Sequence, residues 1–223
     1  MLVYHGSEHI IREPMFHGGK RTNDYGDGFY TTEHIDLARE WACAKNTDGY
    51  ANCYELDMAG LSVININGPE YSILNWLAVL THYRSYWQSG SIAEEAKNYL
   101  QKHFFIDLSP YDIVIGYRAD DSYFSFAQDF VSGAISLRKL SEAMRLGKLG
   151  EQIVLKSEKS YSHIRFLKAE TVRATEWFDK KALRDREARR AYRRSRGRAD
   201  GATELYMLDI LREGITNGDA RLR

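Results

Sequence analysis

The residues best suited to chemistry in this sequence lie between positions 25 and 41. Gly26 and Gly28 lie two positions apart, and glycine permits positive φ angles and a close approach of the backbone to a ligand. Tyr30 follows and is expected to line a pocket. The helical spacing of the apolar residues after it directs the ring of Trp41 into the same pocket. Two such aromatic rings can enclose a planar ligand by stacking on its two faces. Ordinary core packing gives the same pattern, so the rest of the chain must decide between the two.

Several common kinds of site are absent from the sequence. It contains no GxxxxGK[ST] phosphate loop, no GxGxxG fingerprint and no GxSxG nucleophile elbow. His5 and His9 have the spacing of zinc ligands, but they lie on a predicted strand and turn without a third ligand. Only Cys43 and Cys53 are present, too few for a disulfide framework. We therefore expect no metal cofactor and a reducing compartment.

Length and composition are those of a globular protein. The 223 residues are 43% hydrophobic and 13% aromatic, enough for a sizeable core. The sequence has no apolar run of membrane-spanning length and no signal-peptide pattern at its N-terminus. We expect a soluble, cytoplasmic protein.

The net charge of zero hides an uneven distribution. Residues 1–170 contain 17 Lys and Arg against 22 Asp and Glu, whereas residues 171–223 contain 14 against 9. The stretch from Lys180 to Arg198 alone holds ten basic residues. It is either a basic helical arm that contacts nucleic acid or an acidic partner, or a solvated helix with local ion pairs. We expect one domain over residues 1–170 and this arm over residues 171–223.

Apolar periodicity predicts an α+β fold. Strands are expected at residues 2–7, 49–58, 61–67, 111–117, 151–157 and 163–169. Helices are expected after Thr32 as an N-cap and at residues 70–87, 92–104, 122–132 and 135–146. Residues 8–24 have no regular period and are expected to form a loop over the site. The strand at 111–117 ends in a polar cluster, Arg118-Ala119-Asp120-Asp121, and sites often lie at such positions.

Three separated pieces of the chain carry a resemblance to a known family. His5-Gly6-Ser7 ends the first strand, Tyr30 lies in GFYTT, and Glu151-Gln152 opens a late strand. In this order, YHGS, YGDGFYTT and EQIVLK resemble the motifs of the histidine-tyrosine-glutamate type of ADP-ribosyltransferase, as in the poly(ADP-ribose) polymerases. They are more similar still to a bacterial, formerly uncharacterised family in that superfamily. The resemblance covers about residues 2–168. It implies a split β-sandwich of two small sheets around an NAD cleft, with flanking helices.

The resemblance also implies roles for individual residues. Gly6 would bind the nicotinamide carboxamide of NAD through its backbone, with Ser7 in support. His5 would bond a ribose hydroxyl, and Tyr30 and Trp41 would enclose the nicotinamide ring. His5 and Tyr30 are also expected in the catalytic set. The other residues expected to contact NAD are Tyr25, Gly28 and Thr31.

Catalysis in such a pocket would cleave the nicotinamide N-glycosidic bond through an oxocarbenium-like transition state, which a carboxylate stabilises. Aligning on EQIVLK places Gln152 at the position that the closer relatives use, and a one-residue shift places Glu151 there. Adjacent strand residues face opposite ways, so one of the two lies in the pocket. We favour Gln152 as the inward group, with Glu151, or Asp120 and Asp121, as sources of negative charge.

The leading hypothesis is an NAD-dependent mono-ADP-ribosyltransferase that modifies a protein or RNA. By analogy with related bacterial proteins, it would act as a toxin or phage-defence effector held by an inhibitory partner protein. One alternative is an NAD glycohydrolase, which uses water as the acceptor. Another is an NAD-binding module without catalytic activity. This alternative follows from Gln152, whose side chain is an amide and not a carboxylate.

Overall fold

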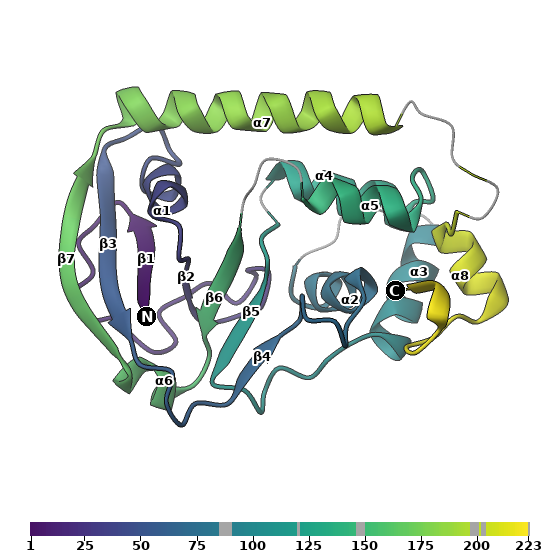
Figure 1. Cartoon of the computed structure of the whole chain (residues 1–223), viewed down its shortest axis with the longest axis horizontal. Helices are drawn as coiled ribbons and strands as arrows, with labels where there is room; N and C mark the ends of the chain where they lie inside the picture. Colours follow the sequence, from purple (N-terminus) through teal and green to yellow (C-terminus); the bar gives the residue numbers. More distant parts are fainter. Residues whose placement is uncertain (85–90, 120, 146–149, 197–200, 202–203, 223) are drawn as a thin grey trace.

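The computed structural model describes the chain except for residues 85–90, 120, 146–149, 197–200, 202–203 and 223, and except for the side chains of residues 91 and 121–123. Over the described residues, two small sheets and the helices around them form an α+β fold (Figure 1). The α+β class predicted from the sequence is therefore confirmed. Of the helices that the structure describes, none is long and apolar enough to cross a membrane.

The first sheet has the strand order β1-β3-β7 and places β1 at an edge. Its strands are β1 (Leu2–Ser7), β3 (Gly49–Leu56) and β7 (Ile164–Val172), and each neighbouring pair is antiparallel. β1 has the bounds predicted from the sequence. β7 continues three residues beyond its expected end, because its last residues remain paired with the start of β3.

The second sheet has the order β2-β6-β5-β4 and places β2 at an edge. Its strands are β2 (Phe29–Thr31), β6 (Glu151–Leu155), β5 (Ile113–Tyr117) and β4 (Val63–Asn65). The two edge strands of the sheets meet at an isolated bridge between Tyr4 and Thr32, with backbone N···O distances of 2.8 and 3.0 Å. One apolar cluster joins the two sheets: Val3, Phe29, Tyr54, Leu56, Ile113, Ile153 and Leu155.

Helix α1 (Ile35–Ala42) packs on β1 and β3 and begins later than expected. The N-cap is His34 rather than Thr32. Thr32 is fully buried, and its backbone is occupied by the bridge to Tyr4. Its hydroxyl accepts from the His34 N–H at 3.2 Å, so it supports the turn before the helix instead of capping it.

The larger core lies among the helices beside the second sheet. These are α2 (Ile73–Tyr83), α3 (Ser91–His103), α4 (Asp121–Val131), α5 (Leu137–Met144) and α8 (Met207–Glu213). Two short helical segments, α6 (Glu158–Ser162) and η2 (Ala220–Leu222), are also present. α2 begins at Ile73 because Ser72 and Asn75 form a capping box. The helix ends at Tyr83 rather than at the expected residue 87, because the backbone is already extended at Arg84. Residues 85–87 themselves lie outside the described residues.

Helix α7 (Ala174–Arg196) crosses from α1 to α5 (Figure 1). The domain boundary expected at residue 170 falls inside β7. Ala188 and Tyr192 of α7 belong to the same core as α2, and so does Ile210 of α8. The C-terminal helices are therefore packed into the fold rather than set apart from it as an arm.

The basic residues of α7 divide between its two faces. Arg184 is partly buried, whereas Arg186, Arg190, Arg193 and Arg194 are exposed. Arg198, the end of the expected basic stretch, lies outside the described residues. Contact between α7 and nucleic acid stays a prediction, and the exposed arginines are the residues that would make it.

Candidate functional site

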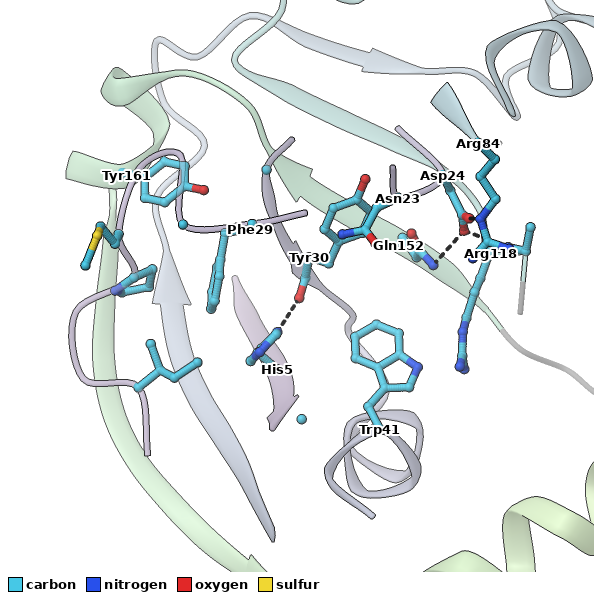
Figure 2. A pocket seen from close by; sticks show the side chains of 18 of the residues that line it. His5, Asn23, Asp24, Phe29, Tyr30, Trp41, Arg84, Arg118, Gln152 and Tyr161 are labelled. Atoms are coloured by element: carbon cyan, nitrogen blue, oxygen red, sulfur yellow. Dashed lines mark hydrogen bonds and ion pairs between the residues drawn. The ribbon is translucent and has the colours of Figure 1, made fainter. Parts of the chain in front are cut away.

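A cavity of about 640 Å³ lies where the edge strands of both sheets meet α1. This volume is in the usual range of small-molecule pockets. Figure 2 shows side chains from separate elements directed into it. Its lining includes His5 and Gly6 of β1, Phe29 and Tyr30 of β2, Trp41 of α1, Gln152 of β6, and Arg118 and Ala119 after β5.

His5 is held by the neighbouring edge strand. Its Nδ1 lies 2.7 Å from the carbonyl oxygen of Tyr30, and its ring packs on Phe29 with centroids 4.6 Å apart. A carbonyl oxygen only accepts, so Nδ1 carries the proton and Nε2 is left as an acceptor. Burial lowers the pKa of His5, and the bond to Tyr30 opposes that shift. The imidazole is therefore neutral at pH 7, with Nε2 available to a hydroxyl donor.

Close packing of helix α1 against β1 requires a glycine at position 6. A Cβ on Gly6 would overlap the carbonyl oxygen of Ala38 and lie 2.6 Å from the backbone nitrogen of Ala42, both in α1. A backbone contact of Gly6 with a ligand stays a prediction, and Gly6 does line the cavity. Tyr4, two residues earlier, directs its N–H and C=O to Thr32 at the free edge of β1. Strand alternation directs the N–H and C=O of Gly6 to the same edge, where the cavity lies.

Tyr30 supports the turn before β2 through its hydroxyl group. The hydroxyl donates to the Gly26 carbonyl at 2.7 Å and accepts from the Tyr25 N–H at 3.0 Å. Gly26 has φ of 75°, as the glycine pattern predicts. At Gly28, a Cβ would lie 2.7 Å from the Leu155 carbonyl oxygen, so this glycine lets the turn pack against β6. The ring of Tyr30 lines the cavity while its hydroxyl holds the turn in place.

Gln152 and Glu151 lie on opposite faces of β6. Gln152 lines the cavity, is 5% exposed, and donates from Nε2 to Oδ2 of Asp24 at 3.3 Å. Glu151 accepts from Asn67 Nδ2 at 2.8 Å and is not among the lining residues. Asp120 lies outside the described residues, as does the side chain of Asp121.

A buried carboxylate that the sequence did not single out lies beside Gln152. Asp24 is 4% exposed, its Oδ1 lies 2.8 Å from Nε of Arg84, and its Oδ2 accepts from the Ala119 N–H at 2.8 Å. Burial raises the pKa of Asp24, and Arg84 is the largest opposing influence. In the sequence, only the position of Asp24 just before the glycine turn indicated that it could belong to the site. Arg84 had no such signal, because it follows a helix that is distant in sequence.

Trp41 enters the cavity from α1 and meets Arg118. The Arg118 guanidinium carbon lies 5.0 Å from the centre of the Trp41 ring, within reach of a cation–π interaction. The indole N–H of Trp41 and the amide oxygen of Gln152 are both buried, and neither has a hydrogen-bond partner among the described residues. Buried polar groups of this kind cost roughly 1–3 kcal/mol each when unpaired. A ligand carrying one acceptor and one donor would relieve that cost.

Besides Glu151, three more residues expected in the site do not line the cavity. The Ser7 hydroxyl donates to the His9 carbonyl at 2.5 Å and so closes a local turn. Tyr25 is fully buried in the helical core, where its hydroxyl donates to the Tyr117 carbonyl. Thr31 is fully buried and donates to the Ile153 carbonyl at 2.7 Å. Their side chains are used by the fold, so these three assignments are corrected.

The loop expected over the site does border it. Glu13, Met15 and Asn23 line the cavity, together with Tyr161 from α6. The loop is tied to the turn before β2 by His17, whose Nδ1 lies 2.6 Å from Oδ2 of Asp27. Lys181 of α7 also lines the cavity, and nothing in the sequence connected it with the three motifs. In the part of the chain that the structure describes, no group of three or more His, Cys, Asp or Glu is placed to hold a metal ion.

Comparison with known proteins identifies one family. The model of a family described as "Protein of unknown function (DUF3990)" matches residues 1–166, about three quarters of the chain. No curated protein matches, and no solved structure matches. The matched region includes the strands that carry His5, Tyr30 and Gln152 and ends before α7.

Proposed function

This chain belongs to the DUF3990 family, and we propose that it is an NAD-dependent mono-ADP-ribosyltransferase with an ADP-ribosyltransferase-like split β-sandwich. The observation that carries the proposal is the convergence of three motifs distant in sequence. His5-Gly6, Tyr30 and Gln152 line one cavity between two small sheets, with Trp41 beside them. Their order and their strand positions are those of the histidine-tyrosine-glutamate pocket that the sequence resembles.

The cavity offers groups that suit NAD as a substrate. Nε2 of the neutral His5 ring accepts a hydrogen bond from a ribose hydroxyl. The outward N–H and C=O of Gly6 match the acceptor and donor of a carboxamide. Trp41 and Tyr30 supply aromatic surface to the nicotinamide ring. Arg84 and Arg118 add positive charge for the diphosphate of the substrate.

The proposed reaction breaks the bond between ribose C1′ and the pyridinium nitrogen, and the bonding electron pair leaves with nicotinamide. An oxygen or nitrogen of a protein or RNA acceptor then bonds C1′ and gives up one proton to solvent. The amide of Gln152 orients the ribose, and its hydrogen-bond partner Asp24 places a carboxylate beside it.

A second candidate, an NAD-binding module without turnover, is favoured by the residue type at position 152. A carboxylate about 4 Å from the developing cation contributes roughly 4 kcal/mol at an effective dielectric constant of about 20, which is about a thousandfold in rate. An amide supplies only a dipole, and Asp24 is already ion-paired with Arg84. Slow turnover or none is the consequence if no other carboxylate reaches the ribose.

Nicotinamide release from NAD tests both candidates. We would compare wild type with Gln152→Ala, and use Glu151→Ala as the matched control because it alters the other face of the same strand. Release that requires added protein or RNA, and that falls only in Gln152→Ala, supports the transferase. Release without an acceptor indicates a glycohydrolase, and NAD binding without release indicates the silent module. Absence of NAD binding refutes the proposal.

A further inference from the structure

Helix α7 lies outside the family match, which ends at residue 166, yet it contributes Lys181 to the lining of the cavity. The family region alone therefore does not supply the whole wall. The position of Lys181 depends on how firmly α7 is attached on either side of the cavity.

The first half of α7 is fastened to α1, the helix that carries Trp41. Arg184 donates from Nε to both carboxylate oxygens of Glu40, at 3.1 and 3.0 Å, and from Nη2 at 2.7 Å. The side chains are only 17% and 10% exposed, so the pair is shielded from solvent. A multiple contact of this kind fixes distance and orientation together. Arg184 lies one turn after Lys181, so it holds that residue at the cavity.

The second half of α7 is fastened to α4. The Tyr192 hydroxyl donates to Oδ2 of Asp129 at 2.5 Å, and the Tyr192 ring stacks on Phe126 with centroids 3.9 Å apart. Arg196 also lies 3.2 Å from Asp129. α7 is thus held at both ends, and Lys181 lies on a fixed element rather than on a free arm.

Lys181 differs from its neighbour Lys180 in its surroundings. Lys180 pairs with Glu176 at 2.7 Å and lies 4.1 Å from the centre of the Trp177 ring. Lys181 is half-buried at the cavity, and the described residues include no carboxylate in an ion pair with it. Its ammonium group keeps three donors for a ligand.

The charges that line the cavity favour an anionic ligand. Among the described residues, Arg84, Arg118 and Lys181 line it together with two carboxylates, Asp24 and Glu13. The charges of Arg84 and Asp24 offset each other in their ion pair, which leaves Arg118 and Lys181 against Glu13. Asp24 is committed to Arg84, and Glu13 lies on the exposed loop. Cations in a hollow with poorly solvated walls attract phosphate groups strongly.

We propose that α7 completes the substrate site and that Lys181 binds the diphosphate of a dinucleotide. This inference rests on the proposed function for the identity of the dinucleotide as NAD, but the diphosphate contact itself does not depend on turnover. It makes the C-terminal helix, outside the family region, a determinant of substrate affinity.

The test is calorimetric titration of the full chain with NAD, ADP-ribose and nicotinamide. Lys181→Ala should weaken binding of NAD and of ADP-ribose about tenfold or more, the usual effect of losing a charge-assisted hydrogen bond. Nicotinamide carries no phosphate, so its affinity should not change. The matched control Lys180→Ala should bind all three ligands as wild type does, and Lys181→Arg should recover most of the loss.

Two results would overturn the inference. One is unchanged affinity of Lys181→Ala for ADP-ribose. The other is an equal loss for nicotinamide, which would mean that the substitution disturbs the packing of α7.

If wild type binds neither NAD nor ADP-ribose, the proposed function fails, and inorganic pyrophosphate becomes the probe. Pyrophosphate binding that Lys181→Ala removes would then support the subsite, and its absence in wild type would refute the subsite as well.

Discussion

Replacing Gln152 by Glu tests the electrostatics of the cavity most directly. In the wild type, Nε2 of Gln152 donates to Oδ2 of Asp24 at 3.3 Å. The substitution places a carboxylate oxygen in that position, against a carboxylate that is 4% exposed. At an effective dielectric constant of about 20, two unit charges at this distance repel by about 5 kcal/mol. Arg84 and Arg118 offset part of this, so we expect a net loss of about 2–4 kcal/mol in the free energy of unfolding at pH 8.

The loss should depend on pH with a definite sign. Repulsion from Asp24 raises the pKa of the introduced carboxyl above its unfolded value of about 4.3, so the folded state holds that proton more tightly. Stability relative to wild type should therefore fall as pH rises through 4.3 and reach its full deficit above the raised pKa. Urea unfolding at pH 5 and pH 8 measures the difference.

A double-mutant cycle isolates the contact between the two side chains. Asp24→Asn removes the second charge, so the double variant Asp24→Asn with Gln152→Glu should regain most of the stability that Gln152→Glu loses relative to its parent. A coupling energy below about 0.5 kcal/mol at pH 8, or a loss that is the same at both pH values, would refute the reasoning.

Three further predictions concern the elements that position the site. Gly6→Ala forces a Cβ against the Ala38 carbonyl oxygen and should cost about 1–3 kcal/mol or more in urea unfolding, whereas Gly201→Ala, with nothing within 4 Å, should change little. Burial lowers the pKa of Lys156 from 10.5 to about 8, so the unfolded chain binds that proton more tightly and stability should rise with pH between those values. Lys156→Met should abolish that rise, and a rise that persists would contradict the assignment. Arg184→Met leaves the Glu40 carboxylate buried and unpaired and should lower the free energy of unfolding by about 3 kcal/mol. Adding Glu40→Gln to the same chain should restore part of that loss. Equal stability of the single and double variants would argue against a shielded ion pair.

The sequence by itself determined the local features around the site. An apolar start followed by polar residues located β1, a β-branched run located β5, and glycine at position 26 predicted the positive φ of the turn. These features depend on neighbours within a few residues, so they can be read without knowing the fold. The polar cluster that begins at Arg118 was visible for the same reason.

Only the tertiary structure decided which side chains share the cavity. Thr31 and Tyr25 lie in the right motif, but the hydroxyl groups of both are used by distant backbone carbonyls. Asp24 and Arg84 meet because a loop and the end of α2 converge there, which no local pattern encodes. Lys181 reaches the cavity because α7 docks on α1 through the buried pair of Arg184 and Glu40. Contacts between segments far apart in sequence depend on how whole elements pack, and that packing is decided by the complete core rather than by any one stretch of the chain.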